Sequence, residues 1–495
     1  MKVCVVGLDG ATWDLLDPWL EELPTIRSFA EELHADLESS LPPISIPAWK
    51  CYSTGMHPGD LGVFTFVEPD FEERRFKTVS NETFVHREVW DYLGEAGYRS
   101  AAINVPSTSP PREIDGWMVS GPFAEPDNFA RPASFQQSLI EDEYTILPEY
   151  YLSRDPTDID AAVESARSKF DVALGVSERA DFVHVTLYIT DTVQHTEWDS
   201  PVSKAFWTAI DRELGRFLDR LGEEWNVVLM SDHGFGPSKG RFYLNTWLER
   251  EGYMALDDSV TDVGDVAELV GLDYKTVYGA IQTLGLAGPL RTIFPSSFLL
   301  KVARQMPGNR KLEGTQEKLD WDADAIALAP LIYTKNRAVA DEIREGLLAI
   351  RDRNGTRVID EVHYGADLYP DCEVRIPDLI VEHTDYVISD VVKSGVLFEY
   401  DLEGDLIAHH RSNGILSARG PDVRKPDLEA ARLYDLTPTV LDAFGVDVPM
   451  AMRGNSLGLL GSNGRRADVP VRHDAARQVV HDEGVEQKLK DLGYL

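Results

Sequence analysis

The fold of this chain is decided at its beginning, by the stretch Val3-Cys4-Val5-Val6-Gly7-Leu8-Asp9-Gly10. The residues before Asp9 are small or apolar without polar alternation, which is typical of a strand buried on both faces. Similar runs recur before residue 250, and segments with helical periodicity lie between them. This alternation predicts an α/β fold with a mostly parallel central sheet that is flanked by helices on both faces. The strand candidates are 3–8, 100–105, 182–189 and 226–230, and the helix candidates are 13–32, 87–96, 159–180 and 203–221.

The chain is predicted to divide into a core and two additions. Residues 257–320 contain helical patterns separated by Gly, Pro and basic residues, so we expect a helical insertion or cap there. The predicted core comprises residues 1–256 and 321–460. Residues 461–495 are rich in Gly, Arg and Asp, and we expect them to form a loosely ordered tail. Within these later parts, strand patterns occur at 325–331, 356–362 and 377–382, and helical patterns at 435–444 and 485–492.

The charge of the chain limits the partners that it can bind. Among 495 residues, 84 are acidic and 48 are basic, which gives a net charge of −36 at pH 7. This charge argues against a nucleic-acid polymer or an anionic membrane surface as partner, because both would be repelled. An anionic small molecule would need a local cationic site, most simply a metal ion. The acidic excess, with Arg preferred over Lys, also predicts adaptation to high salt.

Further sequence features predict a cytoplasmic location. No apolar run is long enough for a transmembrane helix, and the apolar run at the N-terminus is too short for a signal peptide. The three cysteines, Cys4, Cys51 and Cys372, are too few for a disulfide framework and indicate a reducing compartment.

Three of the strand candidates run into an acidic residue. Asp9 ends the first, Asp191 the third and Asp232 the fourth. The carboxyl ends of parallel strands meet at one edge of the sheet, where α/β proteins bind their ligands. Three carboxylates gathered there would repel one another and raise each other's pKa, and a divalent cation removes that cost. Capping of the following helix is the alternative for any one of them, but it does not account for all three.

Histidines accompany two of these carboxylates. His195 follows Asp191 by four residues, about one helical turn, so both side chains can face one cation. His233 follows Asp232 directly and opens a Gly-rich loop. The pair His409-His410 lies between two apolar runs, in a strand–turn–strand context, and is a weaker candidate for a metal ligand.

Ser45 is a candidate nucleophile. It stands shortly before Pro47 at the start of a helix-compatible run, in a position typical of an N-cap. Capping alone is the alternative, but the positive end of a helix and its free N–H groups also suit a developing oxyanion or a bound phosphate. Lys50 and Lys239 could add positive charge to such a site. A solvated surface position is the alternative for both, and it is favoured for Lys239.

With these segments in place, the chain resembles the alkaline phosphatase superfamily, and within it the type I phosphodiesterase / nucleotide pyrophosphatase branch. The resemblance covers residues 1–255 and 325–460, and it implies an alkaline-phosphatase-like core. It is specific because many short motifs occur together. The motifs are Gly7-Leu8-Asp9-Gly10, Ser45-Ile46-Pro47-Ala48-Trp49, Ser53-Thr54-Gly55, Pro58-Gly59, Asp191-Thr192-Val193-Gln194-His195, Ser231-Asp232-His233-Gly234-Phe235-Gly236-Pro237, Phe242-Tyr243-Leu244-Asn245, His410-Arg411 with Asn413-Gly414-Ile415, and the segments 434–441 and 453–457.

The resemblance implies a metal-dependent hydrolase of small-molecule phosphate esters that acts through a covalent phospho-Ser45 intermediate. It implies two divalent metal ions, usually zinc, although the same donor types accept manganese or iron. The resemblance alone selects His410, rather than His409, as a metal ligand. Neighbouring side chains in a strand face opposite ways, so only one of these two histidines is expected to bind a metal ion. One ion would be held by Asp191, His195 and His410, and the other by Asp9, Asp232, His233 and Ser45.

The chain departs from this branch at positions that bear on the substrate. Ser45 stands where most diesterases have Thr, as in monoesterases, and Ala48 stands where several nucleotide pyrophosphatases have Asn. A phosphodiesterase or nucleotide pyrophosphatase is expected, with Lys50 as a candidate substrate-binding residue. The alternatives are a phosphomonoesterase, a sulfatase, a phosphomutase and a catalytically inactive binding protein. A sulfatase is disfavoured because Trp49 stands where sulfatases have Arg. A phosphomutase is disfavoured because the next motifs follow Ser45 at short spacing, and an inactive binding protein is disfavoured because the ligand set is complete.

Overall fold

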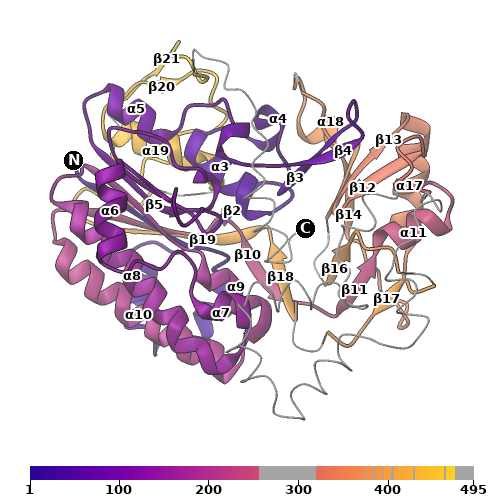
Figure 1. The fold of residues 1–495 in the computed structure, drawn as a ribbon, viewed down its shortest axis with the longest axis horizontal. Helices are drawn as coiled ribbons and strands as arrows, with labels where there is room; N and C mark the ends of the chain where they lie inside the picture. The colour runs from indigo at the N-terminus through magenta and orange to yellow at the C-terminus, as the bar shows by residue number, and fades with distance from the viewer. Residues whose placement is uncertain are drawn as a thin grey trace.

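The computed structural model describes residues 1–255, 319–372, 374–382, 385–393, 395–402, 406–426, 428, 430–461 and 464–473. These residues form two lobes side by side, a larger one that contains the N-terminus and a smaller one on the right of Figure 1. The predicted helical insertion at 257–320 lies outside the described residues, except for residues 319 and 320. The helix predicted at 485–492 lies wholly outside them.

An eight-stranded sheet forms the centre of the larger lobe. Its strand order is β2-β19-β9-β1-β8-β5-β6-β7. The pairs of β1 with β8 and β9, and of β5 with β6 and β8, are parallel, whereas β19 and β7 pair antiparallel with their neighbours. The mostly parallel sheet predicted from the sequence is thereby confirmed. The strands are β1 (Val3–Leu8), β2 (Ala35–Glu38), β5 (Ser100–Val105), β6 (Gly116–Ser120), β7 (Ala130–Arg131), β8 (Phe182–Leu187), β9 (Asn226–Met230) and β19 (Asn413–Arg419).

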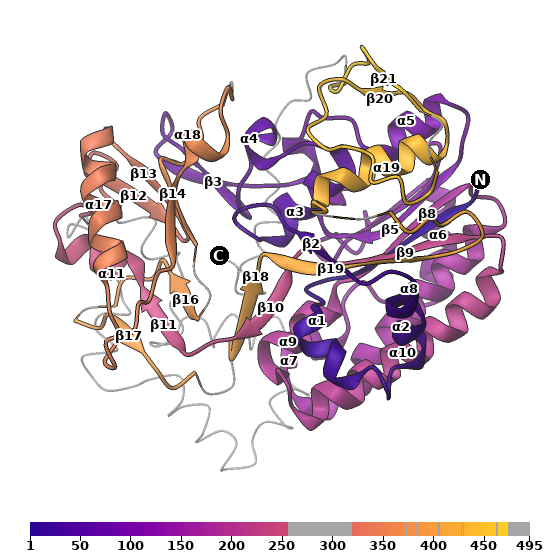
Figure 2. The ribbon, with the colours of Figure 1, turned by 180° about the vertical axis from the view of Figure 1, so that it is seen from behind.

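Helices cover both faces of this sheet. One face carries the long helices α8 and α10 with α2, and the other carries α3, α5 and α19 (Figures 1 and 2). All residues of β1 are buried, because the strand lies in the middle of the sheet between these two layers. The helices are α2 (Pro24–Glu32), α3 (Ser45–Thr54), α5 (Val89–Glu95), α8 (Ile159–Ser177), α10 (Pro201–Leu221) and α19 (Leu436–Ala443).

Two predicted elements of this lobe are shorter than expected. The helix predicted over 13–32 is broken into α1 (Trp13–Leu16), a 3-10 turn at Asp17–Trp19 and α2, because Pro18 and Pro24 each start a new segment. The strand predicted over 182–189 ends at Leu187, and Ile189 already begins α9 (Ile189–Glu197). Asp191 therefore lies in the first turn of a helix instead of at a strand end.

The smaller lobe has a hydrophobic core of its own, which the predicted division of the chain did not include. Side chains from Phe242 to Ile388 form this core. A proline splits the strand predicted over 325–331 into a hairpin, since β12 and β13 are joined through Ala329-Pro330. The lobe contains β11 (Gly240–Tyr243), β12 (Ala325–Leu328), β13 (Leu331–Thr334), β14 (Glu361–Tyr364), β15 (Leu379–Glu382), β16 (Tyr386–Ser389) and β17 (Phe398–Glu399), with α11 (Leu244–Arg250) and α17 (Arg337–Ala349).

Shorter elements complete the described structure. None of the helices that can be followed in it is both long and apolar enough to cross a lipid bilayer. The remaining elements used below are α4 (Pro58–Leu61), α18 (Gly365–Leu368), β10 (Gly234–Pro237), β18 (Ala408–Arg411), β20 (Val448–Pro449) and β21 (Arg466–Ala467).

Gly7 sets how closely α3 approaches the central strand. A Cβ atom at this position would lie 2.4 Å from the Trp49 ring and 3.2 Å from Thr186 Oγ1. The fully buried Trp49 indole in turn donates a hydrogen bond of 2.8 Å to Asp9 Oδ2. The absence of a side chain at Gly7 thus allows the helix to position the first acidic residue after β1.

Replacing Gly7 with Ala is expected to push the indole away and to lower the free energy of unfolding by about 1–3 kcal/mol. Chemical denaturation of both proteins measures this difference. Gly175→Ala is the matched control: nothing lies within 4 Å of the position of its Cβ, and an Ala there is expected to stabilise α8 by up to about 1 kcal/mol. Equal effects of the two substitutions would contradict the packing argument.

Candidate active site

The side chains that the sequence singled out as ligands and nucleophile lie together at the carboxyl edge of the central sheet. β1 and β9 end at this edge, and α9 begins there. The first turn of α3 faces it, and the ribbon formed by β10 and β18 lies beside it (Figure 2). The set is buried, each member being at most 8% exposed, and consists of Asp9, Ser45, Asp191, His195, Asp232, His233 and His410.

Asp9, Asp232 and His233 form one group. His233 Nε2 lies 3.7 Å from Asp9 Oδ1 and 3.4 Å from Asp232 Oδ2. Ser45 Oγ lies 3.2 Å from the same nitrogen. The hydroxyl and three potential metal-binding atoms therefore converge on one point.

Asp191, His195 and His410 form the second group. His410 Nε2 lies 3.1 Å from Asp191 Oδ1 and 3.2 Å from His195 Nε2. The two groups adjoin, because the rings of His410 and His233 stack with their centroids 3.8 Å apart. His409 is half-buried beside them, with its ring 5.8 Å from that of His195, but only His410 also approaches Asp191 and His233.

The backbone fixes which nitrogen of each histidine faces the site. Nδ1 of His195 donates to Ala408 O at 3.1 Å, Nδ1 of His233 to Gly234 O at 3.1 Å, and Nδ1 of His410 to Pro43 O at 2.8 Å. Burial lowers the pKa of His195 to about 4 against the pull of Asp191. A neutral ring whose proton is on Nδ1 presents a bare lone pair on Nε2, which is the form that binds metal ions.

The carboxylates also present lone pairs without donors. Within the described ranges, Asp9 Oδ1, Asp191 Oδ2 and Asp232 Oδ2 are buried and accept no hydrogen bond. Burial raises the pKa of Asp9, and the charge of Asp232 raises it further. Burial also raises the pKa of Asp232, and the charge of Asp191 adds to that rise. Burial also acts on Asp191, but His195 and His410 outweigh it and lower that pKa. Oxygen and nitrogen lone pairs that face one another in a buried site fit divalent cations.

Comparison with known proteins gives the family. A model of the family described as type I phosphodiesterase / nucleotide pyrophosphatase matches residues 3–385. This chain belongs to that family. It is accordingly a phosphoric ester hydrolase, of a superfamily whose members depend on metal ions, and its clusters of buried Asp and His are candidate metal-binding residues.

Solved structures of members of the alkaline phosphatase superfamily share the fold. Phosphonoacetate hydrolase from Sinorhizobium meliloti 1021 is 15% identical, with a TM-score of 0.58 over 88% of this chain and 94% of that one. Human ectonucleotide pyrophosphatase / phosphodiesterase 5 is 16% identical, with a TM-score of 0.51 over 92% and 97%. The alkaline phosphatase PafA is 14% identical, with a TM-score of 0.54 over 93% and 99%. No curated protein matches the chain.

Trp49 and Gly10 position two of the acidic side chains, and neither residue was predicted from the sequence to have this role. Trp49 holds Asp9 Oδ2, and the backbone N–H of Gly10 donates to Asp232 Oδ1 at 3.2 Å. Trp49 lies four residues after Ser45 in α3, so both side chains project from one face of the helix. That spacing is the signal in the sequence from which the role of Trp49 could have been inferred.

Ser45 is not the N-cap of its helix. Ile44 occupies that position with extended backbone angles, and Ser45 is the first helical residue of α3. Its hydroxyl caps no N–H group of the described residues and instead faces His233 Nε2. The N-cap prediction was wrong by one residue, and the shift leaves the hydroxyl available to the site.

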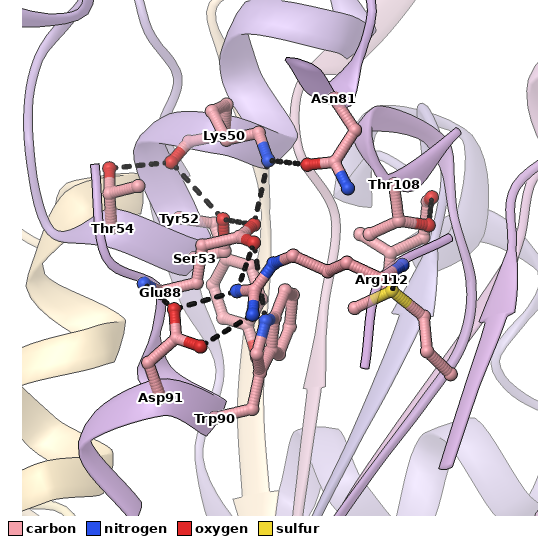
Figure 3. Close-up of polar contacts among 12 residues, drawn as sticks. Lys50, Tyr52, Ser53, Thr54, Asn81, Glu88, Trp90, Asp91, Thr108 and Arg112 are labelled. Carbon is pink, nitrogen blue, oxygen red and sulfur yellow. Dashed lines mark hydrogen bonds and ion pairs between the residues drawn. The ribbon is translucent and has the colours of Figure 1, made fainter. Parts of the chain in front are cut away.

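Lys50 lies in a buried ion network instead of among the seven side chains (Figure 3). Its Nζ donates to Glu88 Oε1 at 2.8 Å and to Asn81 Oδ1 at 3.0 Å. Arg112 binds the other oxygen of Glu88 at 2.8 Å and also contacts Asp91. The network ties α3 to the start of α5, and it gives Lys50 a partner other than a substrate. Lys239 is exposed at the surface and pairs with Asp385 at 2.6 Å.

The Glu88 carboxylate predicts part of the acid sensitivity of the protein. Burial alone would raise its pKa, but the charges of Lys50 and Arg112 outweigh burial and lower the pKa from its ordinary 4.5 to about 2. A group whose pKa is lower in the folded state stabilises the fold above its unfolded pKa. This contribution is therefore lost as the pH falls from 4.5 to about 2.

The variant Glu88→Gln is expected to be less stable by about 3 kcal/mol at pH 7, since it leaves Lys50 and Arg112 without their shared partner. Its stability should also fall less steeply than that of the wild type over the same acid range. Denaturation curves recorded at several pH values measure both effects. Glu113→Gln serves as control, because Glu113 is largely exposed, with only a 3.9 Å contact to Arg131, and should change stability by less than about 0.5 kcal/mol.

Proposed function

We propose that the protein hydrolyses small-molecule phosphodiesters or nucleotide pyrophosphates through a covalent phospho-Ser45 intermediate. The observation that supports this most directly is the position of Ser45 Oγ, 3.2 Å from His233 Nε2 and next to Asp9 and Asp232. A hydroxyl at the meeting point of ion-binding atoms is suited to become a nucleophile.

The proposal includes two divalent metal ions, of which zinc fits the mixture of imidazole and carboxylate donors; manganese and iron are the alternatives. When bound, such ions lower the pKa of a coordinated hydroxyl and offset the charge of the phosphate. That offset matters in a chain with a net charge of −36. One site would consist of Asp9, Asp232, His233 and Ser45, and the other of Asp191, His195 and His410.

The residues of the chain have distinct tasks in this reaction. The Ser45 hydroxyl gives up its proton to solvent, its Oγ forms a bond to phosphorus as the bond to the leaving oxygen breaks, and that oxygen takes a proton from water. A second water then cleaves the phospho-Ser45 ester and frees the hydroxyl. Ser45 and Ile46 begin α3, so their N–H groups lie at the positive end of the helix and face the developing charge. Trp49 keeps Asp9 in place through its indole N–H throughout.

A phosphomonoesterase is the second candidate function. It is favoured by the identity of the nucleophile, Ser45 in place of Thr, and by Ala48, which offers phosphate no hydrogen bond. The hypothesis of a nucleotide substrate is supported by a similar structure, because the inactive murine ectonucleotide pyrophosphatase / phosphodiesterase 5 was solved in complex with AMP. A sulfatase is less well supported, because the position of its Arg is held by Trp49, whose N–H binds Asp9.

The proposal places the enzyme in a reducing cytoplasm at high salt. The three cysteines are free, and two of them are buried in the core. The excess of acidic residues would keep the surface hydrated and soluble at high ionic strength.

Replacing Ser45 with Ala is expected to lower kcat by roughly 10³-fold or more while the protein still binds its metal ions. Ser45→Thr is the matched control, because it retains a hydroxyl and should keep measurable activity. Steady-state kinetics, metal analysis and mass spectrometry of the phosphorylated chain make the comparison. Equal hydrolysis by the metal-loaded wild type and by Ser45→Ala would refute Ser45 as the nucleophile, and if both rates are only at trace level the result would favour an inactive binding protein.

Substrate preference is tested by comparing an aryl phosphodiester, an aryl phosphomonoester and an aryl sulfate at high salt, each with and without a chelator. We expect the diester to be cleaved fastest, and chelation to abolish the activity because the buried lone pairs then have no cation. A preference for the monoester would establish the second candidate function instead. Activity that survives complete removal of metal would contradict the two-ion proposal.

A further inference from the structure

A surface cavity of about 660 Å³ lies at the end of α3 opposite to Ser45. Its wall is formed by residues of α4, of the segment after α18, of the loop after β20 and of β21, which lie near one another in Figures 1 and 2. The helix has ten residues and spans about 15 Å, so the cavity is separate from the ligand cluster. None of the seven side chains of the candidate active site lines it.

Three arginines line this cavity, although the chain as a whole is strongly acidic. They are Arg453, Arg466 and Arg472. Arg453 forms two hydrogen bonds of 2.7 Å with Asp60 and is therefore neutralised. Arg466 contacts only oxygens of neutral groups, such as Met452 O at 3.0 Å, and no carboxylate in the described part of the chain. Its positive charge is thus not paired.

His86 adds an unused hydrogen-bonding atom to the wall. The side chain is 4% exposed, lines the cavity, and its Nδ1 has no hydrogen-bond partner among the residues that the structure describes. Burial, together with the charge of Arg472, lowers its pKa to about 4, so the ring is neutral at neutral pH. Leaving a buried polar atom unpaired costs about 1–3 kcal/mol, which a bound ligand can offset.

Asp371, Asn455 and Asp60, the partner of Arg453, also line the cavity, and apolar side chains form the rest of the wall. Met56, Met452 and Val471 line the cavity, and Met450, which is 66% exposed, stands at its rim. Methionines adapt their shape to an apolar partner. The volume lies within the range of about 300–1,000 Å³ that is usual for small-molecule sites.

We propose that this cavity is a second binding site, for a small organic phosphate. The phosphate group binds the guanidinium groups of Arg466 and Arg472, because planar guanidinium groups match phosphate oxygens in charge and geometry. The apolar body of the ligand packs on the methionines. The site is independent of the metal-dependent chemistry proposed for Ser45.

The test uses phenylphosphonate, which carries a dianion on an apolar ring and contains no ester bond to hydrolyse. Calorimetric titration of the metal-loaded wild type is expected to show two equivalents bound per chain, one at the metal centre and one in the cavity. Ala451→Trp fills the cavity from an exposed position and should weaken the second equivalent roughly tenfold or more. Arg466→Gln should do the same, whereas hydrolysis by Ala451→Trp should stay within about twofold of the wild type.

Arg465→Gln is the matched control for charge. Arg465 is the exposed neighbour of Arg466, pairs with Asp447 at 3.1 Å and does not line the cavity, so this variant should still bind two equivalents. After chelation the wild type should retain one equivalent, and Ala451→Trp none. A wild type that binds one equivalent and loses it on chelation, or a second equivalent unaffected by Ala451→Trp, would overturn the site. A single chelator-resistant equivalent that Ala451→Trp removes would support the cavity and count against the proposed metal centre.

Discussion

Lone pairs face lone pairs at the centre of this protein. The Nε2 atoms of three buried histidines and the oxygens of three buried aspartates point at one another, and the protons of the imidazoles lie on the far side, on backbone carbonyls. Such an arrangement is unfavourable without positive charge between the groups, because each desolvated acceptor has lost its water and gained no donor. The remainder of the larger lobe holds this arrangement in place, and a bound cation turns its cost into affinity.

The helix α3 is the main element that holds the site. Its first residue brings the hydroxyl to His233, and Trp49, one turn later, reaches back to Asp9. Farther along, Lys50 and Ser53 both bind Glu88, which fixes the middle of the helix to α5. At its C-terminal end the carbonyl of Gly55 accepts a hydrogen bond from the backbone of Arg453. The helix is thus attached at its start, middle and end, so Ser45 is positioned by the fold and not by its own rotamer alone.

The parts of the fold that follow from local pattern could be predicted from the sequence. Buried runs such as Val3–Leu8 and Asn226–Met230 became strands with the predicted bounds, and the four-residue spacing of Asp191 and His195 placed both on α9. What depended on distant partners could not be predicted. The sequence suggested Lys50 as a possible phosphate ligand. The structure instead pairs it with Glu88, which lies 38 positions farther along the chain. The strand patterns at 325–331, 356–362 and 377–382 indicated strands of the smaller lobe, but strands of two to four residues do not reveal that they pack around a core of their own.

The order of these residues along the chain sets the order in which the two groups of candidate ligands can be completed during synthesis. Asp9, Asp232 and His233 precede the whole smaller lobe, whereas His410 follows it on β18, immediately before β19 closes against β9. A ribosome-bound chain that has released only its first half can gather one group of ligands and lacks a member of the other. In the proposed two-ion centre, the ligand group that contains His410 would therefore be completed last, when the returning strand β19 joins the sheet.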